Sequence, residues 1–401
     1  MDVIYLDNNA TTRPLPGVVE AVAEANESLW ANPSSVHRFG QAVRQRLELA
    51  RAATAGLIGA RPRELVFTSG GTESAALAIE GLMEARSSAG RITLLTTGTE
   101  HAAVRELADR IDGEGERGRR VVRLEAGAGG VVEVGRLREA LEASRGVVVV
   151  SLMWANNETG AVTPMAAVAA AVAEAREVGR EVWLHTDATQ AVGKLPVDVR
   201  TAGVDLLSFA AHKFHGPKGV GGLWLRRGVR VKPVQVGGPQ ETERRGGTEN
   251  VPGIIGTGVA AEAAAEFVAD PRKIAALAAL RDRLEARVQA GLAEVGLPAA
   301  VVNGGDGERL WNTTNLGFRG LEAEAILLGL SERGVCASAG AACSSGSLEP
   351  SPVLMAMGVG EAVAHGSVRF SLSRFTTADE MDRASAVLVE VVARLSRVLP
   401  V

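Results

Sequence analysis

The chain contains few cysteines. Only Cys336 and Cys343 occur among its 401 residues. Two cysteines seven positions apart make no disulfide framework, and with no further cysteine they make a poor metal site. The sequence therefore predicts a protein of the reducing cytoplasm, without a resident metal ion.

Long apolar runs and an excess of one charge are also missing. No uninterrupted apolar stretch approaches the ~20 residues that a membrane-spanning helix needs, and the first residues lack the basic-then-apolar layout of a signal peptide. The 43 basic and 47 acidic residues give a net charge of −4. We therefore expect neither nucleic acid nor a membrane among the direct partners.

Lysine is scarce as well, with five residues against 38 arginines. The five are Lys194, Lys213, Lys218, Lys232 and Lys273. Any chemistry based on a lysine amine therefore has few candidates in this chain.

What is present is an alternation of short β-branched runs with stretches rich in Ala, Leu, Glu and Arg. Seven runs are predicted strands: residues 65–68, 91–96, 120–124, 147–153, 182–186, 205–209 and 221–225. Helix-like segments between them include residues 40–57, 73–86, 136–143 and 165–178. Several of the runs are almost wholly apolar, as in strands that are covered on both faces. This alternation predicts an α/β fold with a mainly parallel seven-stranded sheet.

The pattern changes after residue 250. Two long helices are predicted over 254–268 and 272–292, then strands at 313–318 and 367–371, and a final helix over 378–398. A glycine- and serine-rich loop spans residues 337–347. We therefore expect a large domain over residues 16–260 and a smaller α/β domain made of residues 1–15 and 261–401.

Residues 67–73, Phe-Thr-Ser-Gly-Gly-Thr-Glu, contain a strand end, a glycine turn and a helix start. Gly71 lets the backbone approach an anion closely, Thr72 offers a hydroxyl, and the helix N-terminus adds its dipole. These features favour a phosphate site. The alternative is a tight turn with a threonine cap.

Asp187 follows the apolar run 182–186, at the edge of an open α/β sheet where ligands bind. A carboxylate at this place can keep a pyridine nitrogen protonated, and Gln190 can reach a ring hydroxyl from the same loop. The alternative is that Asp187 caps the next helix.

Lys213 follows the run 205–209 and precedes a glycine-proline turn. A lysine in a dry pocket has a lowered pKa and becomes a nucleophile that forms Schiff bases. Lys218 is a competitor, but it lies in the turn and farther from the strand end. A merely solvated lysine is the alternative reading for both.

Together, the glycine turn, Asp187 and Lys213, which comes 26 residues after the aspartate, match the arrangement of the fold-type I pyridoxal-phosphate enzymes. The sequence also resembles the class I cysteine desulfurases, especially the branch named for nitrogenase maturation. The matching blocks run from one end of the chain to the other: residues 5–12, 32–37, 154–160, 247–250, 341–351 and 369–377. The block 341–351, Ala-Ala-Cys-Ser-Ser-Gly-Ser-Leu-Glu-Pro-Ser, surrounds Cys343.

The resemblance implies roles for residues around the ring of pyridoxal 5′-phosphate. Lys213 would form the Schiff base with the cofactor and later act as general base. Asp187 would pair with the pyridine nitrogen, and Gln190 would hydrogen-bond the ring oxygen. His101 would stack on the ring and transfer protons.

The resemblance also implies a phosphate site shared between two subunits of a homodimer. Gly71, Thr72 and His212 would hold the phosphate, and Thr248 of the partner subunit would reach it. Asn157 would contact the cofactor and, with Arg369, bind the substrate carboxylate, the arginine bidentately.

Cys343 would receive the sulfur of L-cysteine as a persulfide, and L-alanine would leave. The small residues around it suit a mobile loop; the alternative is a buried, inert thiol. The persulfide would pass to a sulfur acceptor such as an iron–sulfur scaffold protein, and Cys343 could transiently ligate a cluster.

The chain departs from the family pattern at three places. Ala210 stands where a phosphate-binding serine is usual, so one hydroxyl is missing. Gly246 or Gly247 replaces a serine before Thr248, and residues 338–341, Ser-Ala-Gly-Ala, replace a more hydroxyl-rich segment. None of these changes removes a catalytic group.

Other functions on the same scaffold include a selenocysteine lyase, an aminotransferase and a scaffold protein without catalysis. Cys343 on a long loop disfavours the first two, and intact catalytic positions disfavour the third. The sequence does not distinguish iron–sulfur assembly, nitrogenase maturation, tRNA thiolation and DNA phosphorothioation as destinations of the sulfur.

Overall fold

A computed structural model describes residues 3–113, 118–340 and 349–398. Its largest element is a seven-stranded sheet of order β2-β8-β7-β6-β5-β3-β4. Its strands are β2 (Leu65–Thr68), β3 (Ile92–Thr97), β4 (Arg119–Leu124), β5 (Val147–Ser151), β6 (Val182–Asp187), β7 (Leu206–Ala210) and β8 (Gly221–Leu225). β8 runs antiparallel to its neighbours β2 and β7, and all other pairings in this sheet are parallel. The mainly parallel seven-stranded sheet is thus confirmed, with strand ends within two residues of the predicted ones.

The apolar strands are buried on both faces, because successive side chains point to opposite sides of a sheet. Val148 and Val150 join one hydrophobic core, whereas Val147 and Val149 of the same strand join a second core. This explains why the runs lack an apolar–polar alternation.

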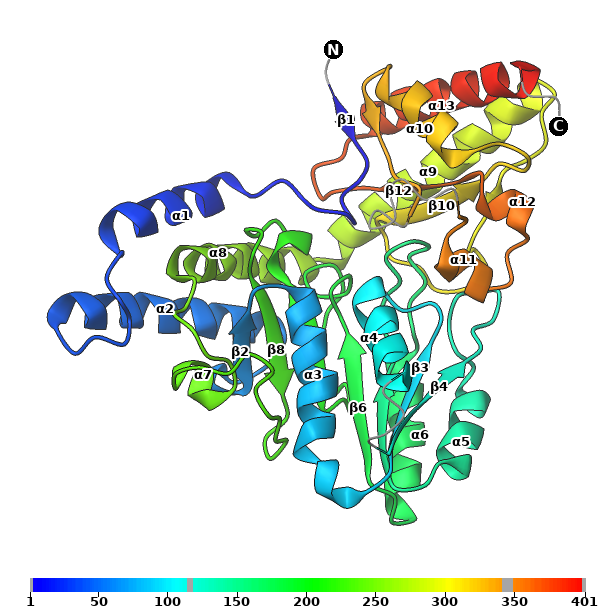
Figure 1. The fold of residues 1–401 in the computed structure, drawn as a ribbon. Coiled ribbons are helices and arrows are strands. Elements are labelled where there is room, and N and C mark those ends of the chain that lie inside the picture. Colours follow the sequence, from blue (N-terminus) through cyan, green and yellow to red (C-terminus); the bar gives the residue numbers. More distant parts are fainter. Residues whose placement is uncertain (1–2, 114–117, 341–348, 399–401) are drawn as a thin grey trace.

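Helices cover both faces of this sheet (Figure 1). The first core contains residues of α1 (Pro16–Ser28), α2 (Arg38–Leu57), α5 (Val134–Ala143), α6 (Met165–Glu177) and α8 (Val251–Val268). The core on the opposite face contains residues of α3 (Gly71–Ala85) and α4 (Ala102–Gly113). A short helix, α7 (Gln240–Glu243), lies in the segment before α8.

A second unit carries its own core and a three-stranded antiparallel sheet of order β12-β10-β9. Its elements are α9 (Pro271–Glu294), β9 (Val301–Val302), β10 (Thr313–Gly317), α10 (Ala323–Ser331), β11 (Val335–Cys336), α11 (Pro352–Ala356), α12 (Glu361–Ala364), β12 (Ser367–Ser371) and α13 (Ala378–Val398). The chain's first strand, β1 (Ile4–Tyr5), pairs with β11 in this unit.

Helix α8 runs from one core into the other. Ala260, Ala261 and Ala264 pack in the first core, whereas Phe267 belongs to the core of the second unit. Among the described helices, α8 alone has the length and composition of a membrane span, with a mean hydropathy of 1.3 over 18 residues, and 61% of that stretch is buried. Packing against α1 and α2 accounts for its apolar character.

Candidate functional site

A cavity of about 240 Å³ lies at the carboxyl edge of the large sheet. Residues that follow the ends of five strands line it, together with Ala10 from the N-terminal segment: Gly71, Thr72, His101, Ala103, Met153, Ala155, Asn157, Asp187, Thr189, Gln190, Ala210, His212 and Lys213. This is the edge at which open α/β sheets bind ligands. Eight of the predicted site residues thus lie around one cavity.

The glycine turn between β2 and α3 forms one end of this cavity. Gly221 of β8 lies directly against the turn, since an added Cβ there would be 2.4 Å from the carbonyl carbon of Gly70. This close approach requires glycine. The first amide groups of α3 have no acceptor within the helix, so Gly71 and Thr72 offer backbone donors to an anion.

The loop after β6 supplies a carboxylate and two polar side chains. Asp187, the last residue of β6, is 5% exposed and accepts a hydrogen bond from the Thr189 amide at 2.9 Å. The Gln190 Nε2 donates to the Asn9 carbonyl at 3.0 Å. The Thr189 hydroxyl is buried without a hydrogen-bond partner among the described residues.

Lys213 ends a single 3-10 turn, Ala211–Lys213, directly after β7. Its Nζ donates to the carbonyl oxygens of Asn9 at 2.6 Å and Ala10 at 2.8 Å. His212 on the same turn lies 3.1 Å from the Thr11 hydroxyl through Nδ1. Burial first, and then the charge of Lys213, lowers the pKa of His212 to about 4, so its ring is neutral near pH 7.

His101 precedes α4 and faces the cavity from the β3 side. Its Nδ1 accepts a hydrogen bond from the Ala103 amide at 3.1 Å, which leaves the proton of the neutral ring on Nε2. Burial lowers the pKa of His101, and the nearby carboxylate of Asp187 only partly opposes this shift. Asn157, which also lines the cavity, has a buried Oδ1 without a partner among the described residues.

Arg369 lies on β12 of the second unit and is only 2% exposed. One terminal nitrogen donates to the Asp7 carboxylate at 2.6 Å, and the other donates to the carbonyls of Asn157 at 3.0 Å and Gly340 at 3.1 Å. Its Nε has no partner among the described residues. Arg369 does not line the cavity, but it donates a hydrogen bond to the carbonyl of Asn157, which does.

Besides Arg369, one described site residue of the sequence prediction lies outside the cavity. Thr248 is exposed and does not line the cavity of its own chain. Its segment is tied to the start of α3, because Arg245 pairs with Glu73 at 2.9 Å. Cys343 lies outside the described residues.

The described residues on either side of Cys343 converge on Glu158. The Ser351 hydroxyl donates to its carboxylate at 2.5 Å, and an added Cβ on Gly340 would lie 2.7 Å from the same oxygen. Burial raises the pKa of Glu158, and the Ser351 hydrogen bond and the charge of Arg369 oppose this shift.

Sequence reasoning assigned no role to Asn9, which connects much of the site. Its carbonyl accepts from Gln190 and Lys213, and its Nδ2 donates to the Asn157 carbonyl at 3.1 Å. It also missed Asp7, the partner of Arg369. Both lie in the matching block at residues 5–12, which was the one signal that could have pointed to them.

Comparison with known proteins identifies the family to which the chain belongs. The signature of the aminotransferase class-V family matches residues 4–384. A cysteine desulfurase of Nostoc sp. is 44% identical over 400 residues, with 100% of this chain and 95% of that protein covered. The cysteine desulfurase NifS of Azotobacter vinelandii is 44% identical over 398 residues, with 99% and 94% covered.

A solved structure of a NifS-like protein superposes with a TM-score of 0.86 at 33% identity, covering 98% of this chain and 100% of that one. The relationship therefore extends over the whole fold, including the second unit with Arg369. The chain belongs to the aminotransferase class-V family and, within it, to the cysteine desulfurases.

Proposed function

We propose that this protein removes the sulfur from L-cysteine with pyridoxal 5′-phosphate held at Lys213, and that Cys343 receives the sulfur as a persulfide. The observation that carries the proposal is the convergence of Lys213, Asp187 and the glycine turn on one cavity in a chain related to desulfurases over its full length. L-alanine is the second product.

The cavity fits pyridoxal phosphate in its polar groups. The start of α3 offers amide donors to a phosphate, while Asp187 offers a carboxylate to a pyridine nitrogen. Buried polar atoms without partners are rare in folded proteins. The Thr189 hydroxyl and the Asn157 Oδ1 are two such atoms on residues that line the cavity, and a polar ligand would satisfy them.

When bound, the cofactor supplies an electron sink that stabilises the charge left by the α-proton of the substrate. Lys213 would hold the cofactor, and its amine could take the α-proton as general base. Asp187 would keep the ring nitrogen protonated. His101, neutral with its proton on Nε2, would lie against the ring and could move a proton at that nitrogen.

Arg369 and Asn157 bind the substrate carboxylate. The buried Nε of Arg369 has no partner among the described residues, and Asp7 holds the guanidinium in place through another nitrogen. Pairing with a carboxylate needs this fixed orientation, because the two N–H bonds must point in parallel.

The transfer of sulfur to Cys343 needs no outside oxidant. The Cys343 thiolate bonds to the substrate sulfur while the substrate carbon–sulfur bond breaks. The electron pair of that bond stays with the carbon skeleton, which takes up a proton and leaves as L-alanine. The persulfide then passes to an acceptor, for which an iron–sulfur scaffold protein is our first candidate, in the reducing cytoplasm.

We also propose a homodimer with shared sites. Thr248 is exposed and lies outside the cavity of its own chain, so in a dimer Thr248 of the partner subunit would complete the phosphate site. The large unit of residues 16–260 would hold the cofactor, and the smaller one would carry the Cys343 loop. Light scattering should give twice the mass of the 401-residue chain, and a monomer with full activity would contradict the shared site.

The test of the proposed function is an assay for alanine and sulfide with the loaded protein and L-cysteine. Cys343→Ser should keep the ~420 nm absorbance typical of the Schiff base of this cofactor but release no sulfide. Cys336→Ser is the matched control and should keep full activity, because Cys336 lies in β11, away from the cavity. Full activity of Cys343→Ser would overturn the sulfur step.

Lys213→Ala tests the cofactor independently of the sulfur step. This variant should lack the ~420 nm band, whereas Lys218→Ala should keep it. Unchanged absorbance in Lys213→Ala would assign the Schiff base to another lysine.

A further inference from the structure

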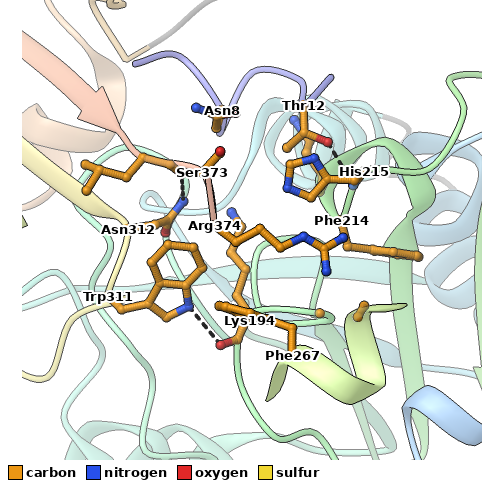
Figure 2. Close-up of a pocket in the computed structure, with 14 residues that line it drawn as sticks. Asn8, Thr12, Lys194, Phe214, His215, Phe267, Trp311, Asn312, Ser373 and Arg374 are labelled. Atoms are coloured by element: carbon orange, nitrogen blue, oxygen red, sulfur yellow. Dashed lines mark hydrogen bonds between the residues drawn. The ribbon is translucent and has the colours of Figure 1, made fainter. Parts of the chain in front are cut away.

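A second lysine, which is buried, lies behind the cavity wall. Lys194 is 4% exposed, and its Nζ donates to the Asn9 Oδ1 at 2.8 Å and to the Gln190 Oε1. It lines a smaller cavity of about 20 Å³ with Trp311 and Arg374 (Figure 2), which has room for about one water molecule. Within the part of the chain described, no carboxylate lies within ion-pair distance of its amine.

A lysine is costly at this position. Burial, then the positive charges of Lys213 and Arg369, lowers the pKa of Lys194 well below its usual value. His212 and His215, whose pKa values are about 4, supply no negative charge, and neither does Arg374, which lines the same small cavity. An apolar side chain would fill the same space without this penalty, so the amine must contribute through its hydrogen bonds.

Those hydrogen bonds fix two amide groups. The amine provides N–H donors whether or not it is charged, and both amides turn an oxygen toward it. Gln190 and Lys194 are four residues apart on consecutive turns after β6, with the Lys194 amide bonded to the Ala191 carbonyl at 3.0 Å. This spacing places both side chains on the same side of the loop.

With its oxygen held by Lys194, the Gln190 amide must direct its nitrogen elsewhere. One N–H of Nε2 donates to the Asn9 carbonyl at 3.0 Å. The second N–H remains for a ligand in the cavity that Gln190 lines. An amide turned the other way would present an oxygen instead of a donor.

We propose that Lys194 is a positioning residue that holds the Gln190 amide with its nitrogen toward the ring oxygen of the cofactor. The proposal rests on the proposed function, in which Gln190 binds that oxygen. An N–H donor stabilises negative charge on the ring oxygen and so lowers the pH at which the bound cofactor loses its proton.

The test is a pH titration of the visible absorbance of the loaded protein. Lys194→Met should raise the midpoint by about one pH unit relative to the unmodified protein. Lys273→Met is the matched control, since Lys273 is exposed on α9, and should leave the midpoint unchanged. An unchanged midpoint in Lys194→Met would overturn the proposal. Absence of a visible band in the unmodified protein would instead contradict the proposed function.

A double-mutant cycle separates positioning from a direct effect of charge. Gln190→Ala should raise the midpoint as Lys194→Met does. Adding Lys194→Met to Gln190→Ala should then cause no further shift. A full additional shift would overturn the proposal, because it would show that Lys194 acts without Gln190.

Gln190→Glu tests the same contact if Lys194→Met does not fold. The carboxylate keeps an acceptor for Lys194 but removes the N–H donor from the cavity side. The midpoint should therefore rise by about one pH unit while the thermal midpoint of unfolding is retained. A normal absorbance midpoint in Gln190→Glu would overturn the proposal.

Discussion

The two halves of the site are held in different ways. The cavity is lined by loops that leave a seven-stranded sheet, and its histidines are kept neutral by burial. Arg369 instead is a buried charge on a three-stranded sheet, balanced by Asp7 from the N-terminal segment. From this difference we propose that the first half would hold the cofactor and the second half would bind the substrate carboxylate. Changes in the two halves should therefore have separable effects.

The largest effect is expected from Asp187→Asn in the cavity. The amide can keep the hydrogen bond with the Thr189 amide but cannot stabilise a protonated ring nitrogen. We expect kcat to fall by about 10³-fold, the usual scale for losing one preorganised electrostatic contact. The ~420 nm absorbance band of the Schiff base between the cofactor and Lys213 should persist. Asp198→Asn, which changes a surface carboxylate paired with Arg200, is the control. A loss of less than tenfold in Asp187→Asn would contradict the assigned role.

Arg369→Lys tests the other half. Lysine keeps the charge but loses the fork of parallel N–H bonds, so we expect KM for L-cysteine to rise by about 10²-fold with unchanged cofactor absorbance. Arg374→Lys is the control, because Arg374 is half-buried on the same segment and does not line the cofactor cavity. Should Arg369→Lys release the cofactor and leave KM unchanged, the division between the halves would be wrong.

Ala210→Ser should strengthen cofactor binding, because it restores a hydroxyl that is usual at this position in the family. Ala210 lies beside Gly71 at the phosphate end, as does the buried hydroxyl of Thr189. One more hydrogen bond to an anion should lower the Kd for pyridoxal phosphate by about tenfold.

Thr189→Val should raise that Kd, and the Kd values of both variants can be measured by titrating the apoprotein. A Kd that Thr189→Val leaves unchanged would show that this hydroxyl does not reach the phosphate.

The smallest effect concerns the acid stability of the large sheet. His185 lies between the hydroxyls of Ser151 at 2.9 Å and Ser208 at 3.0 Å, and burial lowers its pKa to about 4. The unfolded chain takes up this proton near pH 6.5, so the neutral ring contributes stability above that pH and loses it as the pH falls toward 4. For His185 the free energy of unfolding should drop by about 1 kcal/mol between pH 7 and pH 5.5.

Denaturant titrations at the two pH values should show this drop, and His185→Gln should lack that share of it. A variant that retains the full pH dependence would assign the effect to other groups, such as His212 and His215, whose pKa values are also about 4.

Local sequence patterns predicted the sheet because each strand is a short apolar run and both faces are covered. They also located the residues at strand ends, since Asp187 and Lys213 follow apolar runs directly. The structure confirms the predicted fold, and the comparisons confirm the family. The roles of single residues stay predictions. The domain boundary stays a proposal too: residue 260 falls inside the continuous helix α8.

The contacts that complete the site could not be predicted. Asp7 and Arg369 are 362 positions apart, and no periodicity links them. Lys194 was counted among five lysines, yet its burial depends on Trp311 and Asn9, which come from distant parts of the chain. A buried amine has no signature of its own in a sequence.

The pairing of the chain's first strand with its late residues has a consequence for synthesis. Ile4 pairs with Val335, and the Asn9 amide donates to the Ser371 hydroxyl at 2.9 Å. These partners leave the ribosome only when almost the whole chain has been made. All seven strands of the large sheet therefore emerge before the residues that hold Asn9, whose carbonyl accepts hydrogen bonds from Lys213 and Gln190.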